Sequence, residues 1–414
     1  MTIWRLPDTD KNEQGKERIL SSMEKVRLGI IGIGNMGSGH CGSILEGKVP
    51  DMELAAVADL RESRREWARE NLPESVRIFE DGDALIASGC CDAVLVATPH
   101  YEHPRLVMEA FAHGLHALCE KPAGVYTKQV REMNEAAAKT DRVFAMMFNQ
   151  RTNHVYRKMY EIVHSGEYGK IKRVNWIITD WYRTQAYYNS GGWRATWDGE
   201  GGGVLLNQCP HNLDLLQWIC GMPSRVQAFC HVGKWHDIEV EDDVTAYLEF
   251  PDGATGVFVT TTGDAPGTNR FEVTLERGKL VCENDRLSFY ELEVSEREYC
   301  YTATEGFAKP AGHEVTLTTD GENPQHVGVL RAFAANILRG EPLIARGEEG
   351  INGLTLSNAM HLSSWLGKPV DIPFDEDLFL EKLNELRKTS RVKENVQEVT
   401  FSTAGSYGTK EETL

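Results

Sequence analysis

One short segment near the start of the chain limits the folds that this sequence can adopt. The apolar run Val26–Ile31 leads directly into Gly32-Ile33-Gly34-Asn35-Met36-Gly37, a GxGxxG pattern placed where a strand would end and a helix begin. In such a loop the first glycine permits a tight turn, the second lets the backbone approach a pyrophosphate, and the third lets helix and strand pack closely. The helix start then offers N–H groups to the anion. The segment predicts a dinucleotide-binding unit whose cofactor contacts are Gly32, Gly34, Asn35, Met36 and Gly37.

An acidic residue follows at the distance that such a unit requires. Asp59 ends the apolar run Leu54–Ala58, where its carboxylate can bond both ribose hydroxyls. A carboxylate there repels the 2′-phosphate of NADP, so NAD is the expected cofactor. NADP stays open as the less favoured alternative, because the nearby arginines can either accommodate that phosphate or form a solvated helix face; they are Arg61, Arg64 and Arg65.

The pattern around this unit predicts a doubly wound parallel sheet. Short runs that are apolar throughout alternate with helix-like segments, as expected when helices cover both faces of a sheet. The expected strands are Val26–Ile31, Leu54–Ala58, Ala93–Ala97, Ala117–Cys119 and Val143–Met147. The expected helices include Arg64–Asn71, His103–His113 and Lys128–Lys139.

After about residue 150 the pattern changes to consecutive strands with short turns, which predicts an antiparallel sheet. The expected strands are Ile171–Thr179, Val226–Val232, Val244–Phe250, Gly256–Thr262, Phe271–Leu275 and Leu287–Glu291. The expected helices are Val155–His164, His211–Ile219, Val327–Leu338, Gly353–Leu366 and Asp375–Lys388. We therefore expect an α/β Rossmann domain over residues 25–150 and an α+β substrate and oligomerisation domain over 151–394. An N-terminal extension (1–24) and a polar tail (395–414) would flank them.

Composition narrows the classes of function. The 62 acidic and 44 basic residues leave a net charge of −18, which disfavours binding to nucleic acid. No apolar run approaches the ~18 residues of a membrane span, and the first residues lack the pattern of a signal peptide. The nine cysteines are scattered without a CxxC pair, which favours reduced thiols in the cytoplasm and no metal site.

Two further segments fall at the carboxyl ends of predicted strands, the edge at which open α/β sheets bind ligands. Thr98-Pro99-His100 follows the strand Ala93–Ala97, and Glu120-Lys121-Pro122 follows Ala117–Cys119. A lysine there can face a nicotinamide ring or a substrate hydroxyl. Taken alone, Glu-Lys-Pro is more often a surface turn.

A third motif lies in the second half, where Gly201-Gly202-Gly203 precedes Val204-Leu205-Leu206-Asn207-Gln208-Cys209-Pro210-His211-Asn212-Leu213-Asp214. Three glycines allow a close approach of the backbone to a ligand or another segment. If the region is helical, Asn207, His211 and Asp214 lie on one face. Since a histidine before a helix is commonly structural, the spacing alone leaves its role open.

The stretch before these glycines is dense in aromatic rings and hydrogen-bond donors. Such groups suit a polyhydroxylated ring, and an arginine among them can bind a carboxylate or phosphate on it. Core packing is the alternative reading of each aromatic residue. The residues are Trp181, Tyr182, Arg183, Tyr187, Tyr188, Trp193, Arg194 and Trp197.

In combination, these motifs resemble the Gfo/Idh/MocA family, which includes glucose–fructose oxidoreductase, inositol dehydrogenase and the MocA rhizopine-catabolism protein. The matching segments, at family-like spacing across residues 26–220, are GIGNMG, Ala-Asp after the second strand, ATPHYEHP, ALCEKP and GGGVLLNQCPHNLD. The resemblance implies a Rossmann domain followed by an open-faced antiparallel sheet with helices on one side. It also implies a homo-oligomer, a dimer or tetramer, and NAD(P)-dependent oxidation or reduction of a secondary alcohol on a sugar, cyclitol or related compound.

The resemblance also implies roles for individual residues. His211 falls at the position of a catalytic histidine and can take the hydroxyl proton, while Lys121 can stabilise a developing alkoxide. Asn207 departs from the aspartate that many members carry, and its amide can orient a hydroxyl but cannot take a proton. Asp214 is expected to orient a helix or loop. The other implied cofactor contacts are Thr98, Pro99, His100, His103, Glu120 and Asn149, and the implied substrate contacts are Arg151, Tyr182, Arg183, Trp193 and Arg194.

Two alternatives to a freely exchanging dehydrogenase remain at this point. In one, a retained NAD is recycled while a glycoside is cleaved by transient oxidation and elimination, and Asn207 does not exclude this. In the other, the protein is a regulator that binds dinucleotide without catalysis. The presence of both Lys121 and His211 argues against the regulator.

Overall fold

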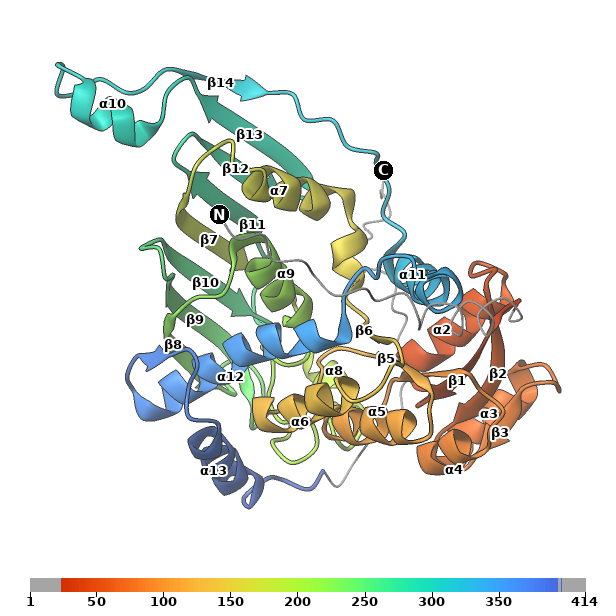
Figure 1. Cartoon of the computed structure of the whole chain (residues 1–414). Coiled ribbons are helices and arrows are strands. Elements are labelled where there is room, and N and C mark those ends of the chain that lie inside the picture. Colours follow the sequence, from red (N-terminus) through yellow and green to blue (C-terminus); the bar gives the residue numbers. More distant parts are fainter. Residues whose placement is uncertain (1–23, 394–395, 397–414) are drawn as a thin grey trace, which may run out of the picture.

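The computed structural model describes residues 24–393 and 396, which form two sheets with helices packed against them (Figure 1). The first sheet has six strands, all parallel, in the order β3-β2-β1-β4-β5-β6. Its strands are β1 (Val26–Ile31), β2 (Met52–Ala58), β3 (Arg77–Phe79), β4 (Ala93–Val96), β5 (His116–Cys119) and β6 (Phe144–Met146). The order reverses between β1 and β4, so the ligand-binding switch point of a doubly wound fold lies at their carboxyl ends. The predicted Rossmann architecture is confirmed.

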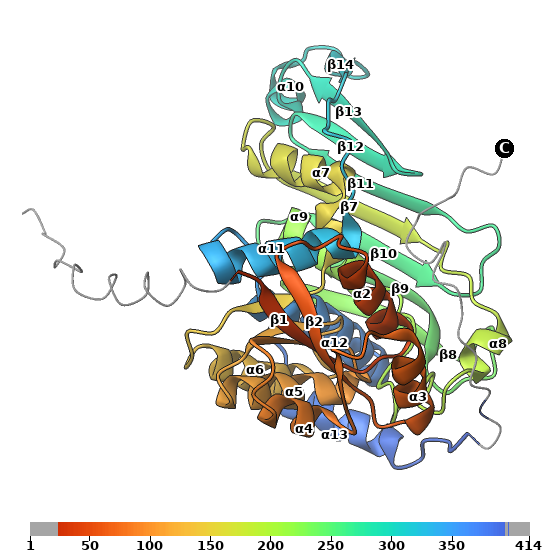
Figure 2. The same ribbon diagram turned by 90° about the vertical axis from the view of Figure 1, so that its right-hand side faces the viewer.

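Helices cover both faces of this sheet. One face packs against α4 (Gly82–Ala87), α5 (His103–Ala112) and α6 (Thr127–Ala137). The other packs against α2 (Asn35–Leu45), α3 (Glu62–Asn71) and α11. Helix α11 (Gln325–Arg339) comes from far along the chain and lies beside β1 (Figure 2). Its buried Val329, Leu330 and Phe333 join the core around β1 and β2. The first sheet is therefore covered in part by a helix that the sequence order places in the second half.

The second sheet has nine strands in the order β14-β13-β12-β11-β7-β10-β9-β8-β15. Its strands are β7 (Ile171–Ile178), β8 (Arg225–Val232), β9 (Glu241–Glu249), β10 (Thr255–Thr261), β11 (Asn269–Leu275), β12 (Gly278–Glu283), β13 (Arg286–Leu292), β14 (Gly312–Val315) and β15 (Val370–Asp371). Its neighbouring strands are antiparallel except β7 and β10, which run parallel. The sheet is thus mixed and mostly antiparallel. Its one parallel pair is possible because the long chain segment between β7 and β10 crosses over, as a parallel pair requires.

One face of the second sheet carries α7 (His154–His164), α9 (Pro210–Cys220) and α12 (Gly350–Leu366). Beneath these helices Trp176 stacks on Phe271 with ring centroids 4.1 Å apart. Among the described residues, apolar side chains on the strands also point outward, including Ile177, Phe229 and Tyr247, which are 42%, 59% and 43% exposed. The open-faced arrangement is therefore confirmed (Figures 1 and 2).

The last helices tie the two sheets together. Helix α12 contacts β8 and α9 of the second half and α6 of the first, while α13 (Glu376–Arg387) adds the ion pairs Arg131–Glu376 and Lys128–Asp377 to α6. The remaining elements are η1 (His100–Glu102), η2 (Asn149–Thr152), α8 (Gln185–Asn189), α10 (Glu296–Thr302) and η3 (Gly347–Glu349). Within residues 24–393, we find no helix with the length and apolar character to span a membrane. The predicted extension (1–24) and tail (395–414) lie almost wholly outside the described residues.

Candidate active site

The glycine loop after β1 combines two tightly packed glycines with an open one. A Cβ on Gly32, whose φ is +90°, would lie 2.6 Å from the carbonyl oxygen of Ala97, and a Cβ on Gly37 would lie 2.0 Å from that of Gly32. A Cβ on Gly34 would meet only a guanidinium nitrogen of Arg61, at 3.9 Å. The first and third glycines are therefore required by packing, whereas the second leaves the surface of the loop accessible to a ligand.

The start of α2 and two buried oxygens fit a dinucleotide at this edge. No side chain caps α2, whose first residues are Asn35, Met36 and Gly37, so the helix start presents its backbone and dipole to an anion. Among the described residues, Thr98 Oγ1 and Asn149 Oδ1 are buried without a hydrogen-bond partner. Because buried polar atoms are normally paired, these two are suited to contact a bound ligand.

Asp59 stands at the end of β2 and fastens the glycine loop. Its Oδ2 accepts a hydrogen bond from the Ile33 N–H at 3.0 Å, and its Oδ1 accepts one from the Arg61 N–H at 3.0 Å. Arg64 donates to the carbonyl of Ile33 at 2.8 Å and Arg65 to that of Asp59 at 2.7 Å. Two of the three arginines on which NADP binding would rely are therefore already engaged with backbone, while the Arg61 side chain is half exposed.

The two histidines predicted to line the cofactor loop are buried and support backbone. His103 lies between two turns, with Nε2 2.7 Å from the carbonyl oxygen of Thr98 and Nδ1 2.7 Å from that of Pro122. His100 Nδ1 lies 3.2 Å from the carbonyl oxygen of Glu200. His103 therefore links the turns after β4 and β5, and His100 links the first of them to the glycine-rich segment.

Glu120 points inward from the turn after β5. Its carboxylate lies 2.7 Å from Nε2 of the buried His40 on α2. Burial by itself raises the pKa of Glu120, but the hydrogen bond from His40 and the charges of His40, His326 and Lys121 outweigh burial and lower the pKa to about 2. Glu120 is therefore ionised at neutral pH and places a negative charge beneath Lys121.

The structure brings together the three residues predicted to be catalytic. Lys121 Nζ donates to the carbonyl oxygen of Asn207 at 2.9 Å, although 86 positions separate them. His211 lies in the first turn of α9, buried beside the Phe148 ring. Burial and then the charge of Lys121 lower the pKa of His211 well below its ordinary value. Burial also lowers the pKa of Lys121, against the opposing charges of Glu120 and Glu200.

The glycine triplet lets this segment fit between the two halves. A Cβ on Gly203 would lie 1.9 Å from the carbonyl oxygen of Glu241, and Gly201, with φ +84°, has Val125 where its Cβ would be. The buried Glu241 carboxylate accepts from the Gly203 N–H at 2.8 Å and the Leu205 N–H at 3.0 Å, and it lies 2.9 Å from His361 Nε2. Glu241 therefore fixes the backbone that leads to Asn207.

The aromatic segment contributes a polar network beside Asn207. Tyr187 donates its O–H to Asn207 Oδ1 at 3.2 Å and accepts from Arg194 at 2.5 Å and from Gln208 at 3.1 Å. The Arg194 guanidinium also lies over the Tyr187 ring, 4.3 Å from its centroid. Of the other predicted substrate contacts, Trp193 meets His100 edge-on, Tyr182 is half exposed, and Arg183 folds back onto the carbonyls of Trp181 and Tyr182.

Arg151 is placed differently from the expectation of a substrate contact. Its Nε and one terminal nitrogen donate to the two oxygens of Asp214 at 2.8 and 2.7 Å, and its other terminal nitrogen donates to Glu349 at 2.5 Å. Both Arg151 and Asp214 are buried, so the pair is structural. Neighbouring Asn149 donates its amide to the Gln325 side chain.

Sequence reasoning did not single out three buried groups of this region: Glu200, Glu241 and His40. Glu200 is 1% exposed, its carboxylate accepts from the Ala195 N–H at 2.5 Å, and it also accepts from the Asn207 amide. An acid between two glycines is ordinarily a solvated turn residue, so its local pattern held no distinguishing signal.

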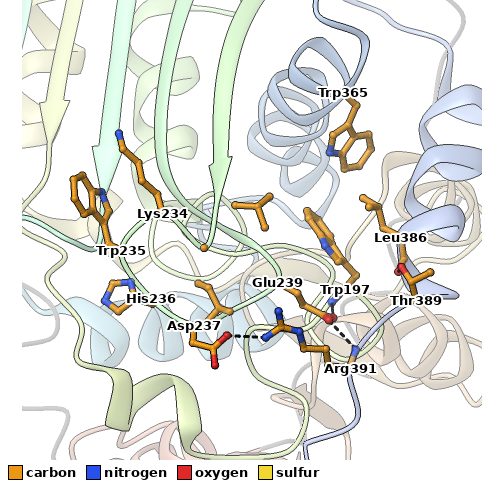
Figure 3. A pocket seen from close by; sticks show the side chains of 13 residues that line it. Trp197, Lys234, Trp235, His236, Asp237, Glu239, Trp365, Leu386, Thr389 and Arg391 are labelled. Carbon is orange, nitrogen blue, oxygen red and sulfur yellow. Dashed lines mark hydrogen bonds and ion pairs between the residues drawn. The ribbon is translucent and has the colours of Figure 1, made fainter.

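A wide pocket of about 800 Å³ opens elsewhere, between residues 232–239 and the helices α12 and α13 (Figure 3). Trp197, Trp235 and Trp365 line it, and two further lining residues, Arg391 and Asp237, form an ion pair at 2.7 Å. Its lining does not include the three residues predicted to be catalytic. No group of three or more histidine, cysteine or acidic side chains in the described part could hold a metal ion, and burial raises the pKa of the Cys209 thiol to about 12.

Comparison with known proteins adds independent findings. A family model described as "Oxidoreductase family, NAD-binding Rossmann fold" (Gfo/Idh/MocA) matches residues 26–148, and the "GFO/IDH/MocA C-terminal domain" matches 156–281. Myo-inositol 2-dehydrogenase of Thermotoga maritima is 26% identical over 342 residues, covering 81% of this chain and 95% of that protein. D-glucoside 3-dehydrogenase of Escherichia coli K12 is 29% identical over 225 residues, covering 49% and 61%.

A solved structure is similar over most of both chains. The WlbA dehydrogenase of Chromobacterium violaceum, in complex with NADH and UDP-GlcNAcA, superimposes with a TM-score of 0.72 at 27% identity, covering 86% of this chain and 98% of that one. Together the two family models span most of residues 26–281, and they confirm the family resemblance that the motifs indicated.

Proposed function

This chain belongs to the Gfo/Idh/MocA family of NAD-binding oxidoreductases, and from that premise we propose that it moves a hydride between nicotinamide and a secondary alcohol of a sugar, cyclitol or sugar derivative. The observation that carries the proposal is the meeting of Lys121, Asn207 and His211 at the carboxyl edge of the first sheet. Lys121 Nζ is bonded to the Asn207 carbonyl and interacts electrostatically with His211. An alcohol oxidation needs a proton acceptor and a stabiliser of negative oxygen in one place, and these side chains supply both.

The roles of the two side chains follow from their protonation. NAD, when bound, supplies the hydride acceptor. The lowered pKa of His211 keeps its imidazole neutral at pH 7, so it can accept the hydroxyl proton. Lys121 offers N–H donors and positive charge to the same oxygen, which stabilises the alkoxide as the proton leaves. Asn207 cannot take a proton and holds Lys121 in place through its carbonyl.

NAD would be held by backbone at the start of α2 and by Asp59. The open face of Gly34 and the N–H groups at Asn35 and Met36 suit the pyrophosphate, and the Asp59 carboxylate suits the ribose hydroxyls. The engagement of Arg64 and Arg65 with backbone favours NAD over NADP.

The substrate side favours a polyhydroxylated compound. Tyr187 and Arg194 form a partly buried ring-and-guanidinium surface beside Asn207, a type of surface that stacks on a sugar ring and can bind an acidic group on it. Tyr182, Arg183 and Trp193 belong to the same segment and remain proposed contacts. The names of two related proteins and the UDP-GlcNAcA bound in a related structure define the compounds to test: inositols, glucosides and a nucleotide-linked uronic acid.

The experiment is incubation of the purified protein with NAD and a panel containing myo-inositol, D-glucosides and UDP-linked N-acetylglucosaminuronic acid, followed by NADH absorbance and product analysis. Accumulation of NADH with one compound supports the proposal and identifies the substrate class. Cleavage of a glycoside without net NADH would instead indicate a retained and recycled cofactor. Binding of NAD without turnover of any compound would favour the regulator.

We also propose that the uncovered face of the second sheet pairs with a second copy of this chain, giving a dimer or tetramer. Outward Ile177, Phe229 and Tyr247 supply the apolar surface. Light scattering on the wild type and on Phe229→Lys tests this, and a monomeric wild type would contradict it.

The nine cysteines are all free, which supports a cytoplasmic location that cell fractionation can check.

A further inference from the structure

The buried carboxylate of Glu200 lies at the end of a hydrogen-bonded line that reaches the catalytic lysine. The Asn207 side chain donates its amide N–H to Glu200, and the Asn207 backbone carbonyl accepts from Lys121 Nζ at 2.9 Å. Glu200 is 1% exposed, whereas Asn207 and Lys121 are partly exposed. Glu200 is therefore too deep to touch a substrate, but it bonds to Asn207 and interacts electrostatically with Lys121.

The line also fixes which way the Asn207 amide faces. With its nitrogen on Glu200, its oxygen is left to accept from Tyr187 at 3.2 Å and from Gln208 at 3.2 Å. A carboxylate accepts hydrogen bonds only, so a reversed amide would set oxygen against oxygen. Glu200 thus determines the arrangement of the whole polar network beside Lys121.

On the basis of the proposed function, we propose that Glu200 is a positioning residue: its carboxylate orients Asn207 and supplies near Lys121 the negative charge that an amide at position 207 cannot provide. Electrostatics supports this, since burial lowers the pKa of Lys121 while the charges of Glu120 and Glu200 raise it. Burial raises the pKa of Glu200 itself. The charge of Arg194 and the hydrogen bonds from the Ala195 N–H and the Asn207 amide act in the other direction and lower this pKa. Other charged or titratable groups that interact with Lys121 include Arg183, Arg194, His100, His103, Cys209, His211 and His326.

The first test needs neither substrate nor NAD. Trace acylation of Lys121 with isotope-labelled acetic anhydride, followed by peptide mass spectrometry across pH, reports the midpoint at which this amine becomes reactive. In Glu200→Gln, which keeps an acceptor oxygen but loses the charge, we expect the midpoint at lower pH than in the wild type. The control is Asp198→Asn, two positions before Glu200 in the chain. It neutralises an exposed acid that pairs with Arg387, and it should leave the Lys121 midpoint unchanged. A Glu200→Gln profile that coincides with the wild type overturns the inference.

A charge-swap experiment separates positioning from simple loop support. Once a substrate is known, Glu200→Gln should lower kcat by up to about 100-fold through misplacement of Asn207 and Lys121. Adding Asn207→Asp to this variant should raise kcat again by at least about tenfold, because a carboxylate then stands at position 207, the residue whose backbone carbonyl accepts from Lys121. Failure of the double variant to recover, with folding confirmed by circular dichroism, overturns the inference.

Two further measurements distinguish a variant that fails to fold, and a failure of the proposed function, from a failure of the inference about Glu200. If Glu200→Gln alone is not folded, the double variant Glu200→Gln/Asn207→Asp keeps one carboxylate in the pair, and its Lys121 midpoint should lie at or above that of the wild type; a lower midpoint counts against the inference. Because the acylation profile is independent of turnover, it decides the role of Glu200 even if no compound in the panel is oxidised. Failure of the proposed function would show instead as absent turnover in the wild type.

Discussion

Arg151 and Asp214 form a two-point ion pair, with N–O distances of 2.8 and 2.7 Å, that is buried on both sides. Arg151 lies in η2, just after the last strand of the first sheet, and Asp214 lies one turn beyond His211 on α9. Glu349 binds the remaining nitrogen of the guanidinium from the segment that leads into α12. The pair therefore sets the position of the helix that carries His211 relative to the sheet that carries Lys121.

Removing this pair should destabilise the fold. We expect Arg151→Ala to lower the free energy of unfolding by about 3–5 kcal/mol, because it leaves the Asp214 carboxylate buried and uncompensated. Urea denaturation measures this. The matched control is Arg157→Ala, whose partly exposed pair with Asp320 should contribute much less to the free energy of unfolding. Equal losses in the two variants would contradict the structural role of Arg151.

Lys121 should be required for turnover and dispensable for cofactor binding. Lys121→Met keeps most of the side-chain volume but loses the charge that stabilises the alkoxide, so we expect kcat to fall by about 10²–10⁴-fold. The dissociation constant of NAD, measured by fluorescence titration, should change little. Lys128→Met, which removes an exposed lysine on α6, serves as the control and should retain activity. Full turnover by Lys121→Met would eliminate the proposed role.

The acid limb of the pH–rate profile should report His211. Its folded-state pKa is well below 6.5, so the neutral base persists as pH falls and is lost only when pH drops through that low value. We therefore expect kcat/KM for alcohol oxidation to stay level down to below pH 6.5. His211→Gln should lower the rate and remove that limb from the profile. A wild-type limb at or above pH 6.5 would show that another group is the base.

Asp59 should set the preference for NAD. Asp59→Asn keeps an acceptor oxygen for only one of the Ile33 and Arg61 N–H groups, which now bond to different oxygens, and it weakens the bond to the ribose hydroxyls, so the Kd of NAD should rise about tenfold. Loss of the negative charge should at the same time improve NADP binding. Titration of both cofactors decides this, and an unchanged ratio of the two Kd values would argue against ribose recognition by Asp59.

The parts of the fold that could be predicted are those marked by a pattern within a few consecutive residues of the sequence. The strands β1, β2, β4 and β5 are short, mostly apolar runs, and a buried parallel strand needs little else to be recognised. Strand β3 (Arg77–Phe79) has three residues, with Arg77 exposed, and was missed for that reason. The parallel pairing of β7 with β10 was also missed, because strand direction depends on the path of the chain between them.

Within the candidate site, too, residues with a local sequence signal were predictable and residues that depend on distant segments were not. Lys121 and His211 were identifiable because the motifs around them resemble those of a known family, and the structure brings both together with Asn207. Arg151 was misassigned as a substrate contact, because its partners lie 63 and 198 positions away and nothing nearby in the chain marks them.

The sequence by itself determined the glycine loop, Asp59 and most of the strands of the first sheet, because backbone geometry and apolar pattern act over a few residues. The tertiary structure alone decided that α11 covers the first sheet, that Arg151 binds Asp214, and that Glu200 is buried against Asn207. The physical reason is desolvation. Whether a charged side chain is a solvated surface group or a buried partner depends on what packs around it, and that packing is contributed by segments distant in the chain.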